Sequence, residues 1–102
     1  MFIPGRIEVL GKHTDYCGGR SIVCAIDRGF HAEIDQAPDR AVVLENLDVS
    51  ERISIALSDP QSLPEHWGNY AVEVIRRLGL NFRERIKDGA KIRFHSDLPK
   101  AA

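Results

Sequence analysis

Residues 4–19 read PGRIEVLGKHTDYCGG, and this stretch holds more chemically capable groups than any other part of the 102-residue chain. Its apolar run at residues 7–10 is typical of a short buried strand, and the glycines that follow allow the backbone to turn sharply. The guanidinium of Arg6, the imidazole of His13 and the carboxylate of Asp15 flank that strand. Because a rigid strand end can present polar groups to a ligand, we expect the function to lie here.

Composition limits the class of protein. Hydrophobic residues make up 43% of the chain and charged residues 28%, which is typical of a soluble globular protein of one domain with a modest core. Apolar runs such as residues 22–26 are too short to span a bilayer, and the N-terminus has no signal-type stretch. We therefore predict a cytoplasmic protein without a membrane partner. The net charge of -1 argues against nucleic acid or another polyanion as a partner.

The cysteines and the basic residues have ordinary interpretations. Cys17 and Cys24 do not form a CxxC pair, so we predict reduced thiols that fill small buried spaces, and no structural zinc. Between Arg76 and Arg93 there are seven basic residues against two acidic ones. No aromatic residues interleave this run in the manner of a nucleic-acid motif, so it indicates a solvated helix face and loop.

Strand patterns dominate the first half of the chain. Apolar and polar positions alternate in several segments bounded by turn residues, which is typical of strands in an antiparallel group. Asp48-Val49-Ser50 has the composition of a tight connection. The strands are predicted at residues 7–10, 21–34, 41–47, 52–57 and 91–94.

One helix is predicted in the second half. Apolar residues from Trp67 to Leu78 recur at helical spacing, and Gly79 is a typical C-terminal stop. Glu73 and Arg77 are placed for an i,i+4 ion pair on its surface. The resulting order, mostly strands followed by a helix and a last strand, is that of an α+β fold.

The stretch at residues 4–19 also resembles a known signature. Pro4-Gly5-Arg6, Gly11, His13, Asp15-Tyr16 and the later glycine pair are similar to the N-terminal signature of the galactokinases. These belong to the kinase superfamily of galactokinase, homoserine kinase, mevalonate kinase and phosphomevalonate kinase. Weaker matches at residues 67–70 and 96–99 follow in the family's order.

The resemblance implies a fold and a domain assignment. The fold would be α+β, a mostly antiparallel sheet with helices on one face, as in the N-terminal domain of these kinases. Residues 1–102 would be the N-terminal part of that domain, incomplete because the phosphate-binding loop, the catalytic aspartate and the C-terminal domain would lie beyond it. The sequence that follows Ala102 would test this.

The resemblance also implies a function. The complete protein would be an ATP-dependent sugar kinase that transfers a phosphoryl group to a sugar hydroxyl, with Mg²⁺ present. ATP and Mg²⁺ would be bound mainly outside this segment, in which we assign no cofactor-binding or metal-binding residue, so the segment alone would be inactive and poorly soluble. The alternatives are a non-catalytic sugar-binding or regulatory relative and a truncated module that binds a partner. Which sugar is used, and the oligomeric state, stay open.

Arg6 is the candidate catalytic residue. In the resembling kinases the equivalent arginine lies beside the hydroxyl that is phosphorylated, where a permanently charged fork can stabilise developing negative charge. The alternative is a structural ion pair.

Lys12, His13 and Asp15 are the candidate sugar-binding residues. On an extended segment His13 and Asp15 would point to the same side and could bracket a polyol. The alternative is a turn in which Asp15 bonds its own backbone and His13 lies on the surface. A metal site is not predicted, because no third ligand is identifiable.

Two positions depart from the galactokinase pattern. Glu8 stands where asparagine is usual, and Lys12 stands where glutamate is usual. Lysine can only donate a hydrogen bond, so Lys12 would change the accepted sugar. Alternatively, Lys12 pairs with Glu8 and the two departures compensate each other.

The other aromatic and imidazole side chains carry no catalytic prediction. Tyr16 and Trp67 are expected to pack. Residue spacing suggests no partner for His31, His66 or His95.

Overall fold

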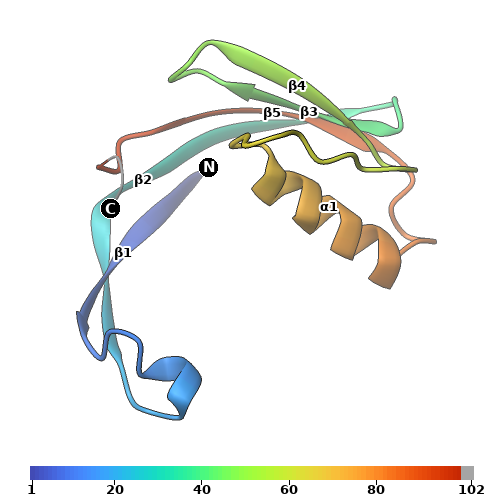
Figure 1. Ribbon diagram of the computed structural model, residues 1–102. Coiled ribbons are helices and arrows are strands. Elements are labelled where there is room, and N and C mark those ends of the chain that lie inside the picture. Colours follow the sequence, from blue (N-terminus) through green and yellow to red (C-terminus); the bar gives the residue numbers. More distant parts are fainter. Residues whose placement is uncertain (100–102) are drawn as a thin grey trace. The chain divides into compact units, whose positions relative to one another are not determined.

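The computed structural model describes residues 1–99 of the chain. It contains five strands and one α-helix in the predicted order, and one short 3-10 helix that was not predicted (Figure 1). The first strand begins at Phe2, earlier than the predicted residues 7–10. In chain order they are β1 (Phe2–Leu10), η1 (Asp15–Cys17), β2 (Ile22–Ala37), β3 (Ala41–Asn46), β4 (Glu51–Ala56), α1 (Asn69–Asn81) and β5 (Gly89–Ser96).

The strands form a sheet in the order β1-β2-β5-β3-β4. β1 pairs with β2 and β3 with β4 in antiparallel fashion, as predicted. The last strand differs, because β5 runs parallel to β3, with Val42 opposite Ala90 and Asn46 opposite Phe94. β4 runs opposite to β3, and the connection through α1 reverses the direction once more as it leads from β4 to β5 on the other side of β3, so β5 runs parallel to β3. The α+β class is therefore confirmed, and the sheet is mixed.

The chain divides into two compact units, of which residues 32–95 form the larger. Its core consists of Leu44 on β3, Ile55 on β4 and Val72 on α1, the last with no exposed surface. Around them pack partly buried side chains, including Trp67 and Ile92 of β5. The apolar face of α1 thus covers one face of β3, β4 and β5, which confirms the predicted packing of Trp67 and of the helix (Figure 1).

The helix does not end at Gly79, where the sequence predicts a stop. It continues to Asn81, and the N–H of Phe82 still donates to the carbonyl of Leu78 at 2.8 Å. Gly79 has no positive φ, so it does not adopt the left-handed geometry of a helix-ending glycine. The surface ion pair also differs, because Glu73 pairs with Arg76 across one turn instead of with Arg77.

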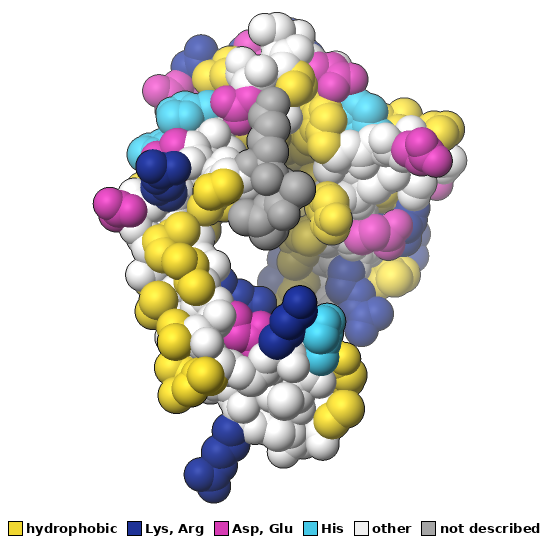
Figure 2. All heavy atoms as spheres, turned by 60° about the vertical axis from the view of Figure 1, so that its left-hand side comes forward, with side chains coloured by type: hydrophobic (Ala, Val, Ile, Leu, Met, Phe, Trp, Pro, Cys, Tyr) yellow, Lys and Arg dark blue, Asp and Glu magenta, His cyan; other side chains and the backbone are white. Residues whose placement is uncertain are grey.

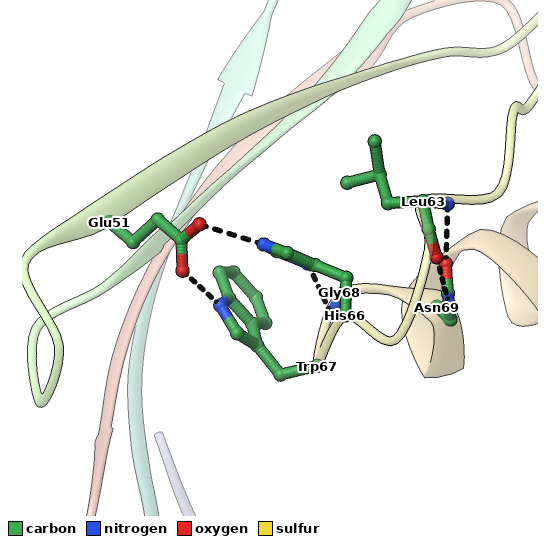
Figure 3. A network of polar contacts seen from close by, with 6 residues as sticks. All are labelled: Glu51, Leu63, His66, Trp67, Gly68 and Asn69. Atoms are coloured by element: carbon green, nitrogen blue, oxygen red, sulfur yellow. Dashed lines mark hydrogen bonds and ion pairs between the residues drawn. The ribbon is translucent and has the colours of Figure 1, made fainter.

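A polar cluster holds the start of α1 to β4 (Figure 3). Glu51 accepts a hydrogen bond from Trp67 Nε1 at 2.6 Å and lies 2.8 Å from His66 Nε2. The N–H of Gly68 donates to His66 Nδ1 at 3.0 Å, which leaves Nε2 as the protonated nitrogen that donates to Glu51. These hydrogen bonds from His66 and Trp67 lower the pKa of Glu51 below its usual value. His66 therefore has partners that residue spacing did not suggest.

Residues 1–31 and the segment from Ser96 form the smaller unit, built on the β1–β2 ribbon. The ribbon is irregular, since pairing shifts between Pro4 and Arg6 and again between Glu8 and Leu10. Pro4 lacks an N–H donor and lies on the outermost strand, where sheets tolerate proline.

The predicted burial of residues 7–10 is wrong. Ile7 is 52% exposed and Leu10 63%, and Figure 2 shows hydrophobic side chains open along this ribbon. Cys17 and Cys24 are exposed as well, so they do not fill buried space. The reason is architectural: the buried core of the described chain lies in the larger unit, whereas a two-stranded ribbon leaves its faces open.

Asp97 ties the end of the described chain to this ribbon. Its Oδ1 accepts from the N–H of Gly29 at 2.6 Å, and its own N–H donates to the carbonyl of Gly29 at 3.2 Å. The Gly29 hydrogen bond lowers the pKa of Asp97. His31 Nε2 lies 3.9 Å from the other carboxylate oxygen, a partner that spacing again did not suggest.

Candidate functional site

The candidate site is built on the loop that joins β1 to β2. β1 ends at Leu10, and Gly11 turns the chain at φ 101°, a conformation that few other residues adopt. A side chain at Gly11 would also meet the carbonyl of Arg20 at 2.6 Å, so the two ends of the loop approach too closely for any Cβ. The glycine is therefore required by conformation and by space.

Thr14 organises this loop. Its hydroxyl donates to the carbonyl of Gly11 at 2.6 Å, with the carbonyl of Arg20 as a second acceptor at 3.1 Å. Its own carbonyl accepts from the N–H groups of Cys17 at 3.1 Å and Gly19 at 2.7 Å. No role for Thr14 is predicted from the sequence. A threonine between two glycine turns was the available signal, because its short hydroxyl can bond nearby backbone.

The loop places His13 in a turn, not on an extended strand. His13 has φ 62°, and Asp15 begins the 3-10 helix η1. The expectation of an extended segment at His13 and Asp15 is therefore wrong, and the strand alternation on which the predicted pairing of the two side chains rested does not apply in a turn. A non-glycine residue in the left-handed region costs about 1 kcal/mol or more, so the surrounding hydrogen bonds must hold it there.

Tyr16 follows in the same turn and does not pack as predicted. Its side chain is 72% exposed, and its ring lies 5.9 Å from the ring of His13. The side chain of Asp15 lies outside what the structure describes, so its predicted sugar contact stays a prediction.

Arg6 lies on β1, between the two register shifts, and is exposed. Among residues 1–99 no ion pair involves Arg6, so the structural ion pair considered above is not formed there. Its guanidinium is left available to a ligand. Irregular pairing of this kind changes the direction in which a strand presents its side chains.

Lys12 is exposed at the tip of the turn. Within the described part of the chain no ion pair joins it to Glu8, which lies on β1. The compensation of the two departures is thus not seen. The structure brings Lys12 and His13 together as neighbours on one loop, whereas no hydrogen bond among the described residues links either of them to Arg6.

The comparisons with known proteins agree with this location. A family model described as the galactokinase galactose-binding signature matches residues 2–35, which include β1, the loop and most of β2. The Actinobacillus pleuropneumoniae galactokinase is 32% identical over 103 residues, covering 100% of this chain. The chain is a galactokinase-like member of the kinase superfamily named above.

Other galactokinases match this galactokinase-like chain equally broadly. The Clostridium beijerinckii galactokinase is 32% identical over 105 residues and the Exiguobacterium sibiricum galactokinase 33% over 108, each covering 100% of the chain. In all three comparisons the chain spans 27% of the relative's length, about a quarter.

Two solved structures are similar in fold to this galactokinase-like chain. The crystal structure of Lactococcus lactis galactokinase complexed with galactose superposes with a TM-score of 0.79 at 26% identity, covering 97% of this chain and 26% of that one. The Methanococcus jannaschii mevalonate kinase gives a TM-score of 0.75 at 23% identity, covering 99% of this chain and 33% of the other. The second match shows a shared fold. The five-stranded sheet with one helix therefore corresponds to the N-terminal domain of a galactokinase.

Neither a metal-binding cluster nor a membrane-spanning helix is found in the described part of this galactokinase-like chain. The described residues contain no group of three or more histidine, cysteine, aspartate or glutamate side chains that could hold a metal ion. None of the helices in the described range is long and apolar enough to cross a membrane.

Proposed function

We propose that residues 1–102 are the N-terminal part of the N-terminal domain of an ATP-dependent sugar kinase. The complete protein would transfer the γ-phosphoryl group of ATP to a hydroxyl of a sugar. The observation that carries this proposal is the coincidence of two features. The galactose-binding signature matches residues 2–35, and the same residues include both the loop that Thr14 holds together and an exposed Arg6 on β1.

In this proposal Arg6 is catalytic. Phosphoryl transfer spreads negative charge over the transferring group and its oxygens, and an arginine stabilises that charge without changing its own protonation. The exposed guanidinium, without an ion-pair partner in the described range, is free to do so. A guanidinium already neutralised by a carboxylate would contribute less.

Lys12, His13 and Asp15 contact the sugar. A sugar hydroxyl can donate to a carboxylate and can accept from an ammonium or an imidazole N–H, so the three side chains offer complementary groups. The hydrogen bonds of Thr14 order the loop before the sugar arrives, which reduces the entropy lost on binding.

ATP and Mg²⁺ are the cofactors implied by a sugar kinase. The described residues contain no group of side chains that could hold a metal ion, and in this proposal ATP and Mg²⁺ are bound mainly by parts of the protein outside this segment. When bound, ATP supplies the phosphoryl group and Mg²⁺ neutralises its charge. A cytoplasmic location stays a prediction.

The test is phosphorylation of a panel of hexoses, deoxy sugars and sugar acids by the complete protein with ATP and Mg²⁺. We expect sugar-dependent ADP release, and we expect Arg6→Ala to lower kcat far more than it weakens sugar binding, because the interaction grows as charge develops. Arg20→Ala is the matched control, since it removes the same charge from the far end of the loop. Sugar binding without phosphorylation would contradict the proposal and favour a non-catalytic relative. A loss of sugar affinity in Arg6→Ala with kcat unchanged would show that Arg6 is only a binding residue.

A further inference from the structure

A pocket of about 500 Å³ lies in the larger unit, outside the signature residues. Its walls come from three places: the bend before β3, the segment that follows β4, and the C-terminal half of α1 with the turn after it. In Figure 1 this is where the end of β4 faces the far end of α1. The volume falls within the usual range for small-molecule sites, about 300 to 1,000 Å³.

Three arginines line this pocket with a single carboxylate. Arg40, Arg76 and Arg83 contribute guanidinium groups, and Asp59 is the one acidic residue in the lining. In the described range no ion pair joins Asp59 to any of them. The lining therefore carries a formal excess of positive charge, in a chain whose net charge is -1.

The cationic walls are held in place by hydrogen bonds. Arg76 Nη2 donates to the carbonyl of Pro60 at 2.8 Å, which fastens α1 to the segment after β4. The N–H of Leu57 donates to the carbonyl of Arg40 at 3.0 Å. Past the helix, the N–H of Ile86 donates to the carbonyl of Phe82 at 3.2 Å and closes the turn that carries Arg83.

Arg40 and Arg83 remain available to bind a ligand. Arg76 is engaged with Pro60 and with the carboxylate of Glu73. By contrast, Arg40 and Arg83 are exposed, and among residues 1–99 neither forms an ion pair. Two guanidinium forks over apolar side chains such as Leu57 and Leu80 match a ligand with a compact dianion and an uncharged body.

We propose that this pocket binds a phosphate-bearing small molecule, with the guanidinium groups of Arg40 and Arg83 donating hydrogen bonds to the phosphate oxygens. Arg76 and Arg83 belong to the run of basic residues between Arg76 and Arg93, which the sequence indicated was a solvated face. In this proposal part of that run lines a ligand-binding pocket. A compact phosphate monoester fits better than a polyanion, because the three arginines line one pocket and do not form the extended basic groove that would follow a polyanionic backbone. None of its lining residues lies within residues 2–35, so this pocket shares no residue with the proposed sugar site.

The test measures phosphate binding to the complete protein with the sugar and nucleotide sites saturated by the preferred sugar and a non-hydrolysable ATP analogue. The probes are inorganic phosphate, a hexose phosphate and a nucleoside monophosphate, which distinguish the possible sources of the phosphate group. The test variant is Arg40→Gln with Arg83→Gln. The matched control is Arg77→Gln with Arg85→Gln, which removes the same charge from nearby exposed positions outside the pocket.

We expect at least one probe to bind, and the pocket variant to weaken that binding about tenfold or more, since each charge-assisted hydrogen bond contributes strongly. We expect the control to weaken it about twofold or less, and the NMR signals of the Arg40 and Arg83 Nε–H groups to shift on titration. Equal weakening in the two double variants would overturn the proposal and indicate diffuse electrostatic attraction. Absence of binding by all three probes, or shifts confined to residues outside the lining, would also overturn it.

Discussion

Replacing Thr14 by valine tests whether one hydroxyl holds the proposed sugar-binding loop. Valine keeps the branched shape of threonine but removes the donor that bonds the carbonyl of Gly11 at 2.6 Å. The bond is partly buried and neutral, so its loss should cost about 1 kcal/mol, or roughly fivefold in the equilibrium constant between the ordered and the open loop. Thr14→Ser is the matched control, because it keeps the hydroxyl and removes only a methyl group.

Hydrogen exchange reads the loop directly. The N–H groups of Cys17 and Gly19 donate to the carbonyl of Thr14, so both should exchange up to about fivefold faster in Thr14→Val and at an unchanged rate in Thr14→Ser. If the sugar binds only the ordered loop, saturating sugar should slow the exchange of both N–H groups, and the sugar affinity should fall by at most the same factor.

The two measurements can fail separately. Unchanged exchange in Thr14→Val would show that the hydroxyl does not order the loop, and the structural argument would be wrong. Faster exchange that saturating sugar slows neither in Thr14→Val nor in Thr14→Ser would instead show that the loop is not part of the sugar site, which would refute the proposed role of Lys12 and His13.

Three further predictions concern specificity, the core and pH. Lys12→Glu should improve the use of galactose relative to other sugars by roughly 5- to 150-fold in kcat/KM, because glutamate can accept a hydroxyl hydrogen bond, and an unaltered ranking in the sugar panel would reject the idea. Val72→Ala should lower the free energy of unfolding by about 2 kcal/mol, whereas Val74→Ala, on the same helix but 58% exposed, should change it by less than about 0.5 kcal/mol, as measured by urea unfolding followed through Trp67 fluorescence. Because hydrogen bonds from His66 and Trp67 lower the pKa of Glu51 from 4.5, its contribution to stability is present above pH 4.5 and is lost as pH falls through the lower folded value. Glu51→Gln should therefore flatten the acid limb of a stability-against-pH curve, and an acid limb identical to that of the unaltered protein would contradict this assignment.

Local patterns in the sequence determined much of this protein. Alternation located the strands, and helical spacing located α1, because both signals depend on which residues share a face within a few positions along the chain. Gly11 also marked a turn locally, because glycine adopts the positive φ found there without a steric cost. The galactokinase-like signature was readable for the same reason, since its residues are contiguous.

Tertiary structure decided what depends on distant partners. The parallel pairing of β5 with β3 follows from how the chain crosses over through α1, which no local pattern encodes. His66 and Glu51 are 15 residues apart in sequence, and Gly29 and Asp97 are 68 apart, so residue spacing could not pair them. The exposure of Ile7 came from the same source, because burial depends on which element lies opposite a strand, and a sequence pattern records only the strand itself.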